Sequence, residues 1–225
     1  MLVCANFMKS YAVKPKEFAE KVRLAEKFGA DMVYIVDSSG GMFPQDIQRY
    51  YRAIRKVYHK PLGFHGHDNL ALAVSNNLEA IRMGITFVDS SLQGLGRGGG
   101  NASTEVFVAA LLKSGHKLKI DLLKVLEIGQ KYINPLINVR GRLLLDIVAG
   151  YADFHSSYMH HIHKYAAKYN INPAVLIIEI TKINKIDVDE KVLDKVARRI
   201  KKSEEVYLGK FDFSRYIGRE QDKMK

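Results

Sequence analysis

The chain has 225 residues, of which 47% are hydrophobic, and its formal net charge is +11. This length and composition allow a large core, in one domain or in a domain with an appendage. The single cysteine, Cys4, excludes an internal disulfide and fits a reducing compartment. The sequence contains no apolar run of the ~20 residues needed to span a bilayer, and its start lacks a signal-peptide layout. We therefore expect a cytoplasmic protein that does not enter a membrane.

The positive charge is compatible with a nucleic-acid partner, an anionic substrate or a lysine-rich proteome. Basic residues are dispersed along helix faces, and only KVARRIKK, residues 195–202, forms a cluster. Charges on helix faces are usually solvated, so we expect no binding of nucleic acid.

The first half of the sequence alternates between strand and helix patterns. Strands are predicted over residues 2–8 (buried), 32–37, 62–67 and 86–91. Helices are predicted over residues 16–28, 44–58, 69–83 and 102–112. Gly29 and Gly84 suit helix ends, and Pro44 suits a first turn.

An internal repeat accompanies this alternation. FGADMVYIVDSS (28–39) and MGITFVDSS (83–91) both run from a helix end through a glycine and a strand to Asp-Ser-Ser. Successive predicted strand ends are 29, 29 and 25 residues apart. A (β/α)₈ barrel uses roughly 30 residues for each βα unit, and strands that alternate with helices form parallel sheets. Doubly wound sheets have the same rhythm, so spacing alone leaves both architectures open.

Past Gly115 the strand patterns stop. Helical patterns cover residues 121–133, 143–168 and 190–202, with Pro135 and Pro173 as breaks, and residues 175–182 fit either a short strand or a helix. We therefore divide the chain into an α/β region, residues 1–115, and a mostly helical appendage, residues 116–225. The last dozen residues are expected to fray.

Two histidines stand one residue apart in GFHGHDNL, residues 63–70. Because side chains alternate along a strand, His65 and His67 should lie on one face, where two imidazoles can bind one metal ion. The alternative is two unrelated histidines in a polar loop. In a parallel barrel the active site lies at the carboxyl ends of the strands, where Asp37, Ser38 and residues 89–91 are also expected. This setting favours a metal site.

The glycine-rich stretch GLGRGGGN, residues 94–101, contains G-x-G-x-x-G between a strand and a helix. A dinucleotide site would need a further strand with an acidic end about 20 residues on, and that region, KIDLLKVLEI, has a helical pattern. We expect no dinucleotide there. The glycines instead let the backbone approach a metal-bound substrate or its carboxylate.

A third cluster lies in GYADFHSSYMHH, residues 150–161. Tyr151, His155 and Tyr158 are spaced to share one face of a helix. Such a stripe serves either core packing or catalysis, and the spacing does not decide between them.

Taken together, these motifs resemble the 4-hydroxy-2-oxovalerate aldolases, members of the metal-dependent lyase superfamily that includes hydroxymethylglutaryl-CoA lyase. The similar stretches are YIVDSSGGMFPQDI, GFHGHDNLALAVSNNLEAI, VDSSLQGLGRGGGNASTEV and GYADFHSSYMHH, in the family's order from residue 3 to about 180. The resemblance implies a TIM barrel of which this chain holds the last four βα units. It also implies a lyase that cleaves a 4-hydroxy-2-oxo acid to pyruvate and a short aldehyde, in aromatic hydrocarbon catabolism.

The resemblance also implies roles for single residues. His65 and His67 would be ligands of a divalent cation, most often Mn²⁺ in this family, with Asn101 as a further ligand. Ser38 and His65 would contact the pyruvyl part of the substrate. The helical region, residues 116–225, would be the part that docks an acylating acetaldehyde dehydrogenase.

The chain departs from the family pattern in two places. His155 stands where the family presents a tyrosine, and it is our candidate for catalytic proton transfer because imidazole exchanges protons near neutral pH. Alternatively, Tyr151 or Tyr158 substitutes, or activity is impaired.

The second departure is that no DTTLRDG-like motif, with its Arg-Asp pair and nearby histidine, occurs in the sequence. We therefore expect that the amino-terminal half-barrel is missing, and that another chain supplies it, two half-barrels self-associate or the chain is poorly soluble. The alternative function is a non-catalytic remnant or interaction module that keeps the fold and the partner surface.

Overall fold

The structure, a computed structural model, describes residues 1–137 and 141–202 together with Phe213. The predicted fraying of the last dozen residues lies outside the described residues. The α/β region contains the strands β1 (Cys4–Phe7), β2 (Met32–Asp37), β3 (Leu62–Gly66) and β4 (Phe87–Val88). They form one sheet in the order β1-β2-β3-β4, with every neighbouring pair parallel, as the alternation of strands and helices predicts.

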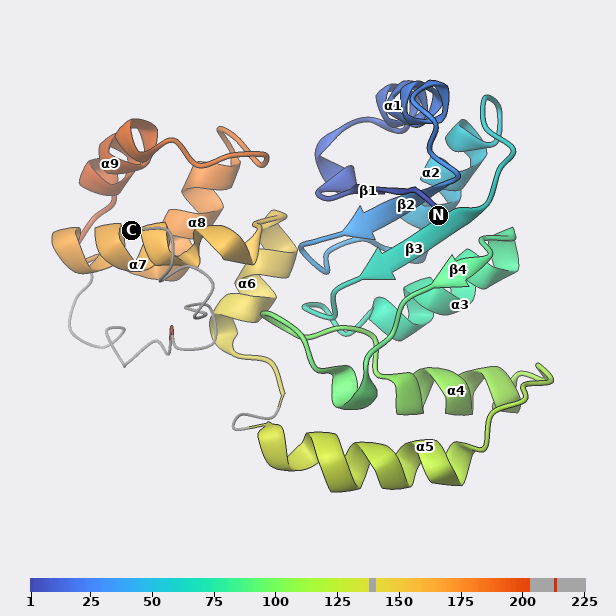
Figure 1. The fold of residues 1–225 in the computed structure, drawn as a ribbon. Helices are drawn as coiled ribbons and strands as arrows, with labels where there is room; N and C mark the ends of the chain where they lie inside the picture. The colour runs from blue at the N-terminus through green and yellow to red at the C-terminus, as the bar shows by residue number, and fades with distance from the viewer. Residues whose placement is uncertain (138–140, 203–212, 214–225) are drawn as a thin grey trace.

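Each strand is followed by a helix (Figure 1). These helices are α1 (Pro15–Lys27), α2 (Pro44–Ile54), α3 (Ala73–Met83) and α4 (Thr104–Lys113). Pro15 and Pro44 occupy first-turn positions, where the missing N–H costs nothing. Gly84 ends α3 with a φ of 91°, which a residue with a side chain rarely adopts.

The two faces of the sheet differ sharply. On one face, apolar side chains of β2 and β3 pack against α1, α2 and α3 in a continuous buried cluster that includes Phe18, Ile35 and Phe64. The opposite face carries the alternate residues, among them an exposed Cys4 and Phe87, which is 44% exposed. A parallel sheet is normally covered on both faces, so this open face is a feature to be explained.

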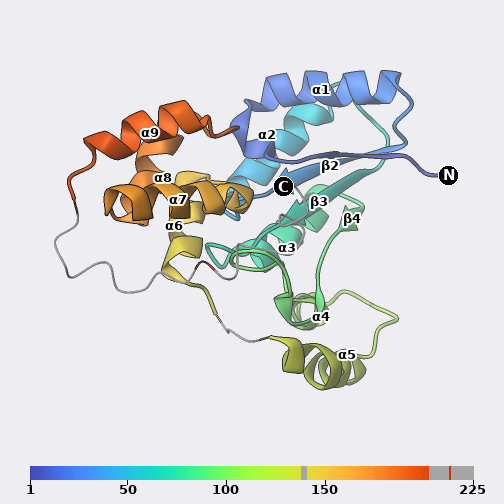
Figure 2. The ribbon, with the colours of Figure 1, turned by 60° about the vertical axis from the view of Figure 1, so that its left-hand side comes forward.

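The second half of the described chain is helical. Its helices are α5 (Leu122–Ile128), α6 (Leu144–Ala152), α7 (Met159–Tyr169), α8 (Pro173–Thr181) and α9 (Glu190–Arg199). Helices α6 to α9 share a separate buried cluster that includes Ile162, Leu176 and Leu193. Figures 1 and 2 show this group beside the sheet, at the end toward which the strands point.

Several predicted elements need correction. The first strand is not buried, because β1 is the edge of the sheet and its residues alternate between exposed and half-buried. The helix predicted over 143–168 is two helices, since Asp153 has a φ of 55° and ends α6. The ambiguous stretch 175–182 falls within the helix α8 and its end, and Pro173 begins that helix rather than breaking one.

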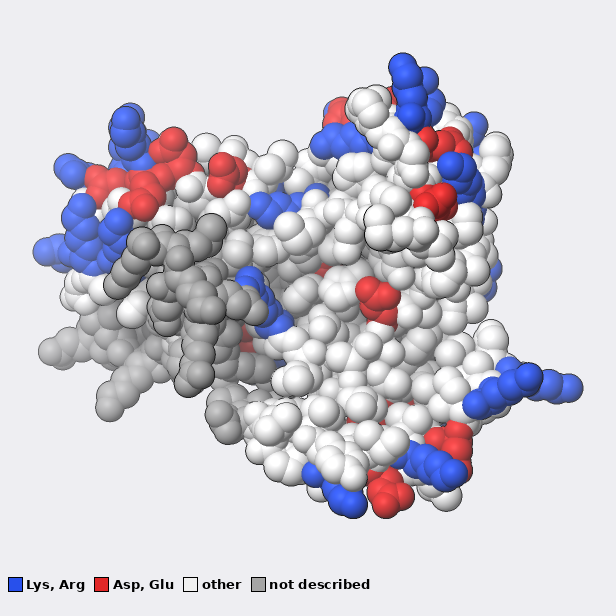
Figure 3. All heavy atoms as spheres, in the orientation of Figure 1, with Lys and Arg blue, Asp and Glu red and all other residues white. Residues whose placement is uncertain are grey.

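The surface gives two further results. Charged side chains gather mainly toward the periphery of the face in Figure 3, and its centre is mostly uncharged. Among the described residues, no helix has the length and apolar character needed to cross a bilayer.

Candidate active site

His65 and His67 lie at the carboxyl end of β3. His65 belongs to the strand, and His67 follows its last residue, Gly66. The two ring centroids are 5.3 Å apart, so the rings lie on the same side of the chain, as alternation predicts. This separation is compatible with one cation between two imidazole nitrogens.

One nitrogen of each ring contacts a neighbouring oxygen. His65 Nδ1 lies 3.1 Å from Asp89 Oδ2, and Tyr34 donates a hydrogen bond of 3.1 Å to the other oxygen of that carboxylate. His67 Nδ1 lies 3.4 Å from the Arg97 carbonyl oxygen. Neither Nε2 has a hydrogen-bond partner among the described residues. Metal-binding histidines usually have this arrangement, in which an oxygen orients the ring through the nitrogen that does not bind the metal.

Burial lowers the pKa of His67 to about 4, and the charge of His65 acts in the same direction. The imidazole of His67 is therefore neutral near pH 7. Neutral imidazole is the form that can donate a lone pair to a cation.

Asn101 lies beside this pair, at the end of the glycine-rich loop. Its backbone forms an antiparallel bridge with His67, and its side chain lines an open hollow of about 370 Å³ together with His65. Asn101 Nδ2 donates to the Leu95 carbonyl at 3.0 Å, whereas the buried Oδ1 has no partner among the described residues. Leaving a buried acceptor without a hydrogen-bond partner costs about 1–3 kcal/mol of stability. A ligand bound at this oxygen would offset that cost.

The donor atoms of the three side chains are chemically suited to a divalent cation. Two imidazole nitrogens and one amide oxygen are a mixed donor set of the kind that Mn²⁺ and Zn²⁺ accept. No group of three His, Cys, Asp or Glu suited to a metal occurs in the described part of the chain. The amide of Asn101 therefore decides whether the set has a third protein donor. Asn76 and Asn77 also have buried amide oxygens without partners, so the position beside the histidines is what distinguishes Asn101.

Ser38 lies on the neighbouring strand end, after β2. Its side chain is buried, and Oγ accepts a 2.9 Å hydrogen bond from the Lys9 N–H. The preceding Asp37 is completely buried and accepts hydrogen bonds from the N–H groups of Gly41 and Met42, so it closes the Ser-Ser-Gly-Gly loop. Burial raises the pKa of Asp37 to about 6. The loop is thus held by hydrogen bonds, and the His67 N–H donates to the Asp37 carbonyl at 3.1 Å.

His155 comes from the helical half of the chain. Its Nδ1 lies 2.7 Å from Ser157 Oγ and accepts a 3.2 Å hydrogen bond from the Ser157 N–H. Burial lowers the pKa of His155 to about 4, and the charges of Lys9, His67 and Arg97 contribute. The structure therefore brings His155 to the same end of the sheet as His67, although no hydrogen bond joins the two side chains.

The aromatic stripe does not lie on one helix. Helix α6 ends at Ala152, His155 precedes a short 3₁₀ turn, and Tyr158 ends that turn just before α7. Tyr151 is 72% exposed, whereas the Tyr158 hydroxyl accepts a 2.9 Å hydrogen bond from Lys9 Nζ, and its ring lies 6.2 Å from that of His155. The prediction of a shared helix face is wrong because Asp153, in the left-handed conformation, ends α6 between them.

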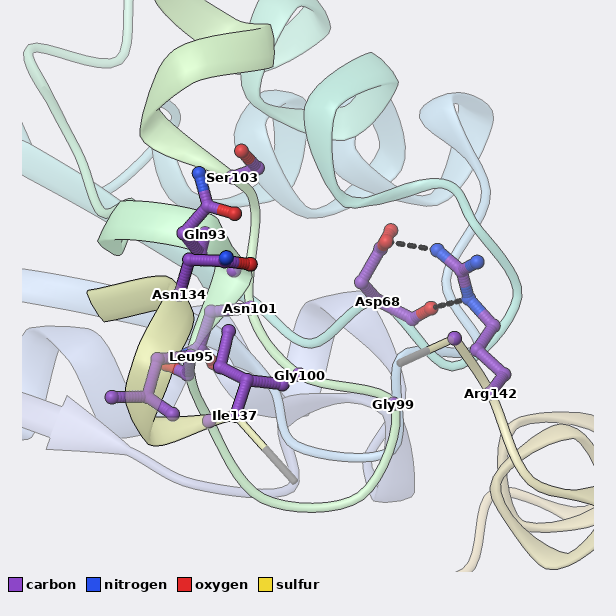
Figure 4. A pocket seen from close by; sticks show the side chains of 13 residues that line it. Asp68, Gln93, Leu95, Gly99, Gly100, Asn101, Ser103, Asn134, Ile137 and Arg142 are labelled. Carbon is purple, nitrogen blue, oxygen red and sulfur yellow. Dashed lines mark hydrogen bonds and ion pairs between the residues drawn. The ribbon is translucent and has the colours of Figure 1, made fainter. Parts of the chain in front are cut away.

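The glycine-rich loop borders a cavity of about 240 Å³, which Asn101, Asp68 and Arg142 also line (Figure 4). Gly96 lies so close to Asn101, and Gly99 to Asn69, that a Cβ on either glycine would come within 2.6 Å of them. These glycines are needed for close packing of the loop against the site. That no dinucleotide binds there stays a prediction.

Sequence reasoning missed two contacts at the site. Lys9, just after β1, donates to Tyr158, and the signal for it is a lysine directly after the predicted buried strand 2–8. Arg142 pairs with Asp68, the residue after His67, across 74 positions, and no local pattern indicates this pair.

The chain is similar to one family model and to several curated proteins. The HMGL-like family model matches residues 3–131. A 4-hydroxy-2-oxovalerate aldolase of Bacillus thuringiensis is 35% identical over 203 residues, which are 90% of this chain and 60% of the relative. One from Pelotomaculum thermopropionicum is 39% identical over 181 residues, 79% of this chain and 52% of the relative. The chain thus spans about 60% or less of the length of these curated relatives.

Two solved structures are also similar to this chain. The hydroxymethylglutaryl-CoA lyase of Bacillus subtilis is 27% identical with a TM-score of 0.53, covering 62% of this chain and 52% of that one. The carboxyl transferase domain of Rhizobium etli pyruvate carboxylase has a TM-score of 0.66 at 16% identity, covering 87% of this chain and 36% of that one, and shows the fold alone. With its family model matched over more than half of its length, the chain belongs to the HMGL-like family.

Proposed function

We propose that the chain is the carboxyl-terminal part of a divalent-metal-dependent aldolase that cleaves a 4-hydroxy-2-oxo acid to pyruvate and a short aldehyde. The observation that carries this proposal is the group formed by His65, His67 and the unsatisfied amide oxygen of Asn101 at the carboxyl end of a parallel sheet. The similarity to curated 4-hydroxy-2-oxovalerate aldolases supports the reaction class.

His65, His67 and Asn101 would hold the cation, for which Mn²⁺ is our first candidate. When bound, the cation acts as a Lewis acid that polarises the 2-oxo group and stabilises the negative charge that develops on its oxygen. Asp89 holds His65 by its Nδ1 and keeps Nε2 available. Ser38, buried beside the site, would hold the pyruvyl part with its hydroxyl proton, since its oxygen already accepts the Lys9 N–H.

Cleavage requires a base that removes the proton of the 4-hydroxyl group as the C3–C4 bond breaks, and C3 of the departing pyruvate must then be protonated. His155 would move the first of these protons. In one tautomer its Nδ1 accepts from the Ser157 N–H, and in the other Nδ1–H donates to Ser157 Oγ, which leaves Nε2 free as a base. Both tautomers therefore have a partner, and the neutral ring can change between them.

We also propose that the sheet is half of a (β/α)₈ barrel. The chain would then consist of a half-barrel, residues 1–115, and a helical appendage, residues 116–225. The open inner face supports this, because exposed Phe87 and partly exposed Tyr34 and His65 lie where barrel strands would enclose them. Within the described residues, the outer edges of β1 and β4 pair with no other strand. An amino-terminal half-barrel or a second copy would close this face, and the helical appendage would contact an aldehyde dehydrogenase.

The test is an assay of pyruvate release from 4-hydroxy-2-oxopentanoate with added Mn²⁺. The 225-residue chain is assayed alone and after co-expression with the first four βα units of an aldolase relative. We expect turnover in the co-expressed pair, little in the chain alone, and none in the pair after His155→Phe. Normal turnover by a monomer of the 225-residue chain would contradict the half-barrel, and no turnover under any condition would contradict the aldolase.

A further inference from the structure

We propose that Arg142 is a positioning residue that fixes the loops carrying His67 and Asn101 relative to each other, by holding Asp68. This inference rests on the proposed function, because it assigns Arg142 to the same metal site. Arg142 lies in the helical half of the chain, just before α6, and its hydrogen bonds within the described residues go to Asp68 rather than to His67 or Asn101.

Asp68 connects three segments of the site. Its N–H donates a 2.8 Å hydrogen bond to the Gly100 carbonyl, directly beside the bridge between His67 and Asn101. One oxygen of its carboxylate accepts a 2.9 Å hydrogen bond from the N–H of Ala73, the first residue of α3. Asp68 thus links the metal-site strand, the glycine-rich loop and the start of a helix.

Arg142 holds Asp68 at two points. Its Nη2 pairs with the carboxylate oxygen Oδ2, and its Nε donates to the main-chain carbonyl of the same residue (Figure 4). The side chains of Arg142 and Asp68 are 30% and 21% exposed, so the pair is largely shielded from solvent. A planar guanidinium that binds the carboxylate and the main-chain carbonyl of Asp68 fixes the orientation of the peptide between Asp68 and Asn69, and a lysine ammonium lacks this rigid two-nitrogen geometry.

The next residue along the chain strengthens this attachment. Asn69 is buried, and its Nδ2 donates a 2.9 Å hydrogen bond to the Asp146 carbonyl in α6. The exit of β3 is therefore tied twice to the segment 142–146. The helical half contributes to the metal site through this attachment as well as through His155.

The experiment uses the full 225-residue chain in four forms: wild type, Arg142→Gln, Arg142→Lys and Arg82→Gln. Arg82 is the matched control, since it pairs with Glu79 through two nitrogens on the exposed side of α3, away from the site. Free Mn²⁺ is measured by electron paramagnetic resonance during titration, well below the unfolding temperature of each variant. Hydrogen exchange of the peptides covering residues 66–70 and 98–102 is measured without metal.

We expect both Arg142 variants to weaken Mn²⁺ binding about tenfold and to exchange faster in both peptides, and Arg82→Gln to match wild type. An Mn²⁺ affinity unchanged by Arg142→Gln, or exchange unchanged in both peptides, would overturn the positioning role, even if the variant unfolds at a lower temperature. If wild type binds no Mn²⁺ while Arg142→Gln still speeds exchange, the metal site of the proposed function fails and the positioning of the two loops stands.

Discussion

In the α/β half of the molecule, apolar side chains of β2 and β3 pack under α1, α2 and α3, whereas α6 to α9 bury one another without any strand. The first half carries the two histidines, and the second contributes His155, on whose pKa the charge of His67 acts, and Arg142, which binds Asp68. Each half has its own core, yet the proposed site uses side chains from both. The comparison shows that one site can take side chains from two regions that each pack around their own hydrophobic core.

Truncation of a buried residue in each half tests whether the cores are separate. Phe64 and Leu176 are both completely buried, one in each cluster. We expect Phe64→Ala to cost about 3–5 kcal/mol and Leu176→Ala about 2–5 kcal/mol, because each leaves a cavity. Hydrogen exchange measured by mass spectrometry should quicken mainly over residues 32–66 in the first variant and 144–199 in the second.

Exposed neighbours serve as controls for these two variants. Phe87 and Val175 are 44% and 39% exposed, and their replacement by Ala should cost much less than the buried truncations. If each buried truncation speeds exchange equally in both halves, the two cores form one cooperative unit and the comparison fails.

His155, in the helical half, should make the free energy of unfolding depend on pH, with a smaller effect than the buried truncations. Its pKa is lowered to about 4 from the ordinary value of 6.5, so the unfolded chain binds more protons between these values. Stability from this residue is therefore fully present above pH 6.5 and is lost as the pH falls toward 4. After a discount for partial exposure, we expect about 1–2 kcal/mol.

Urea denaturation of wild type and His155→Asn between pH 4 and pH 8 measures this contribution. The stability advantage of wild type over the variant should shrink as the pH falls. The raised pKa of Asp37 acts in the opposite direction but is common to both proteins, so it cancels in the difference. A difference that does not change with pH would show that His155 is not held in its neutral form.

The sequence predicts the α/β half well because local patterns determine it. Strand alternation places His65 and His67 on one side, and glycines mark the helix ends where Gly29 and Gly84 have positive φ. Helix α3 begins later than the apolar pattern indicates, because the carboxylate of Asp68 binds the N–H of Ala73 and holds the preceding residues in a turn. The side chain that sets this boundary is polar, so hydrophobic periodicity does not detect it.

Contacts between residues far apart in the sequence are less predictable. The break at Asp153 depends on a left-handed residue that aspartate tolerates but does not require, and the Lys185 ammonium binds its carboxylate at 2.6 Å from 32 positions away. Arg142 and Asp68 are likewise far apart in sequence. Such pairs follow from how elements distant in the sequence pack together, which local spacing does not encode.

The most direct test of the central claim is the metal content of His65→Ala/His67→Ala, measured by elemental analysis after loading with Mn²⁺ and desalting. Both side chains are only partly buried, so the variant should fold, which circular dichroism can check. A matched control is His160→Ala/His163→Ala, which removes two exposed histidines from α7. We predict that wild type and this control retain the cation and that the variant without His65 and His67 loses it. Equal metal retention by all three proteins would contradict the metal site, and with it the proposed aldolase mechanism.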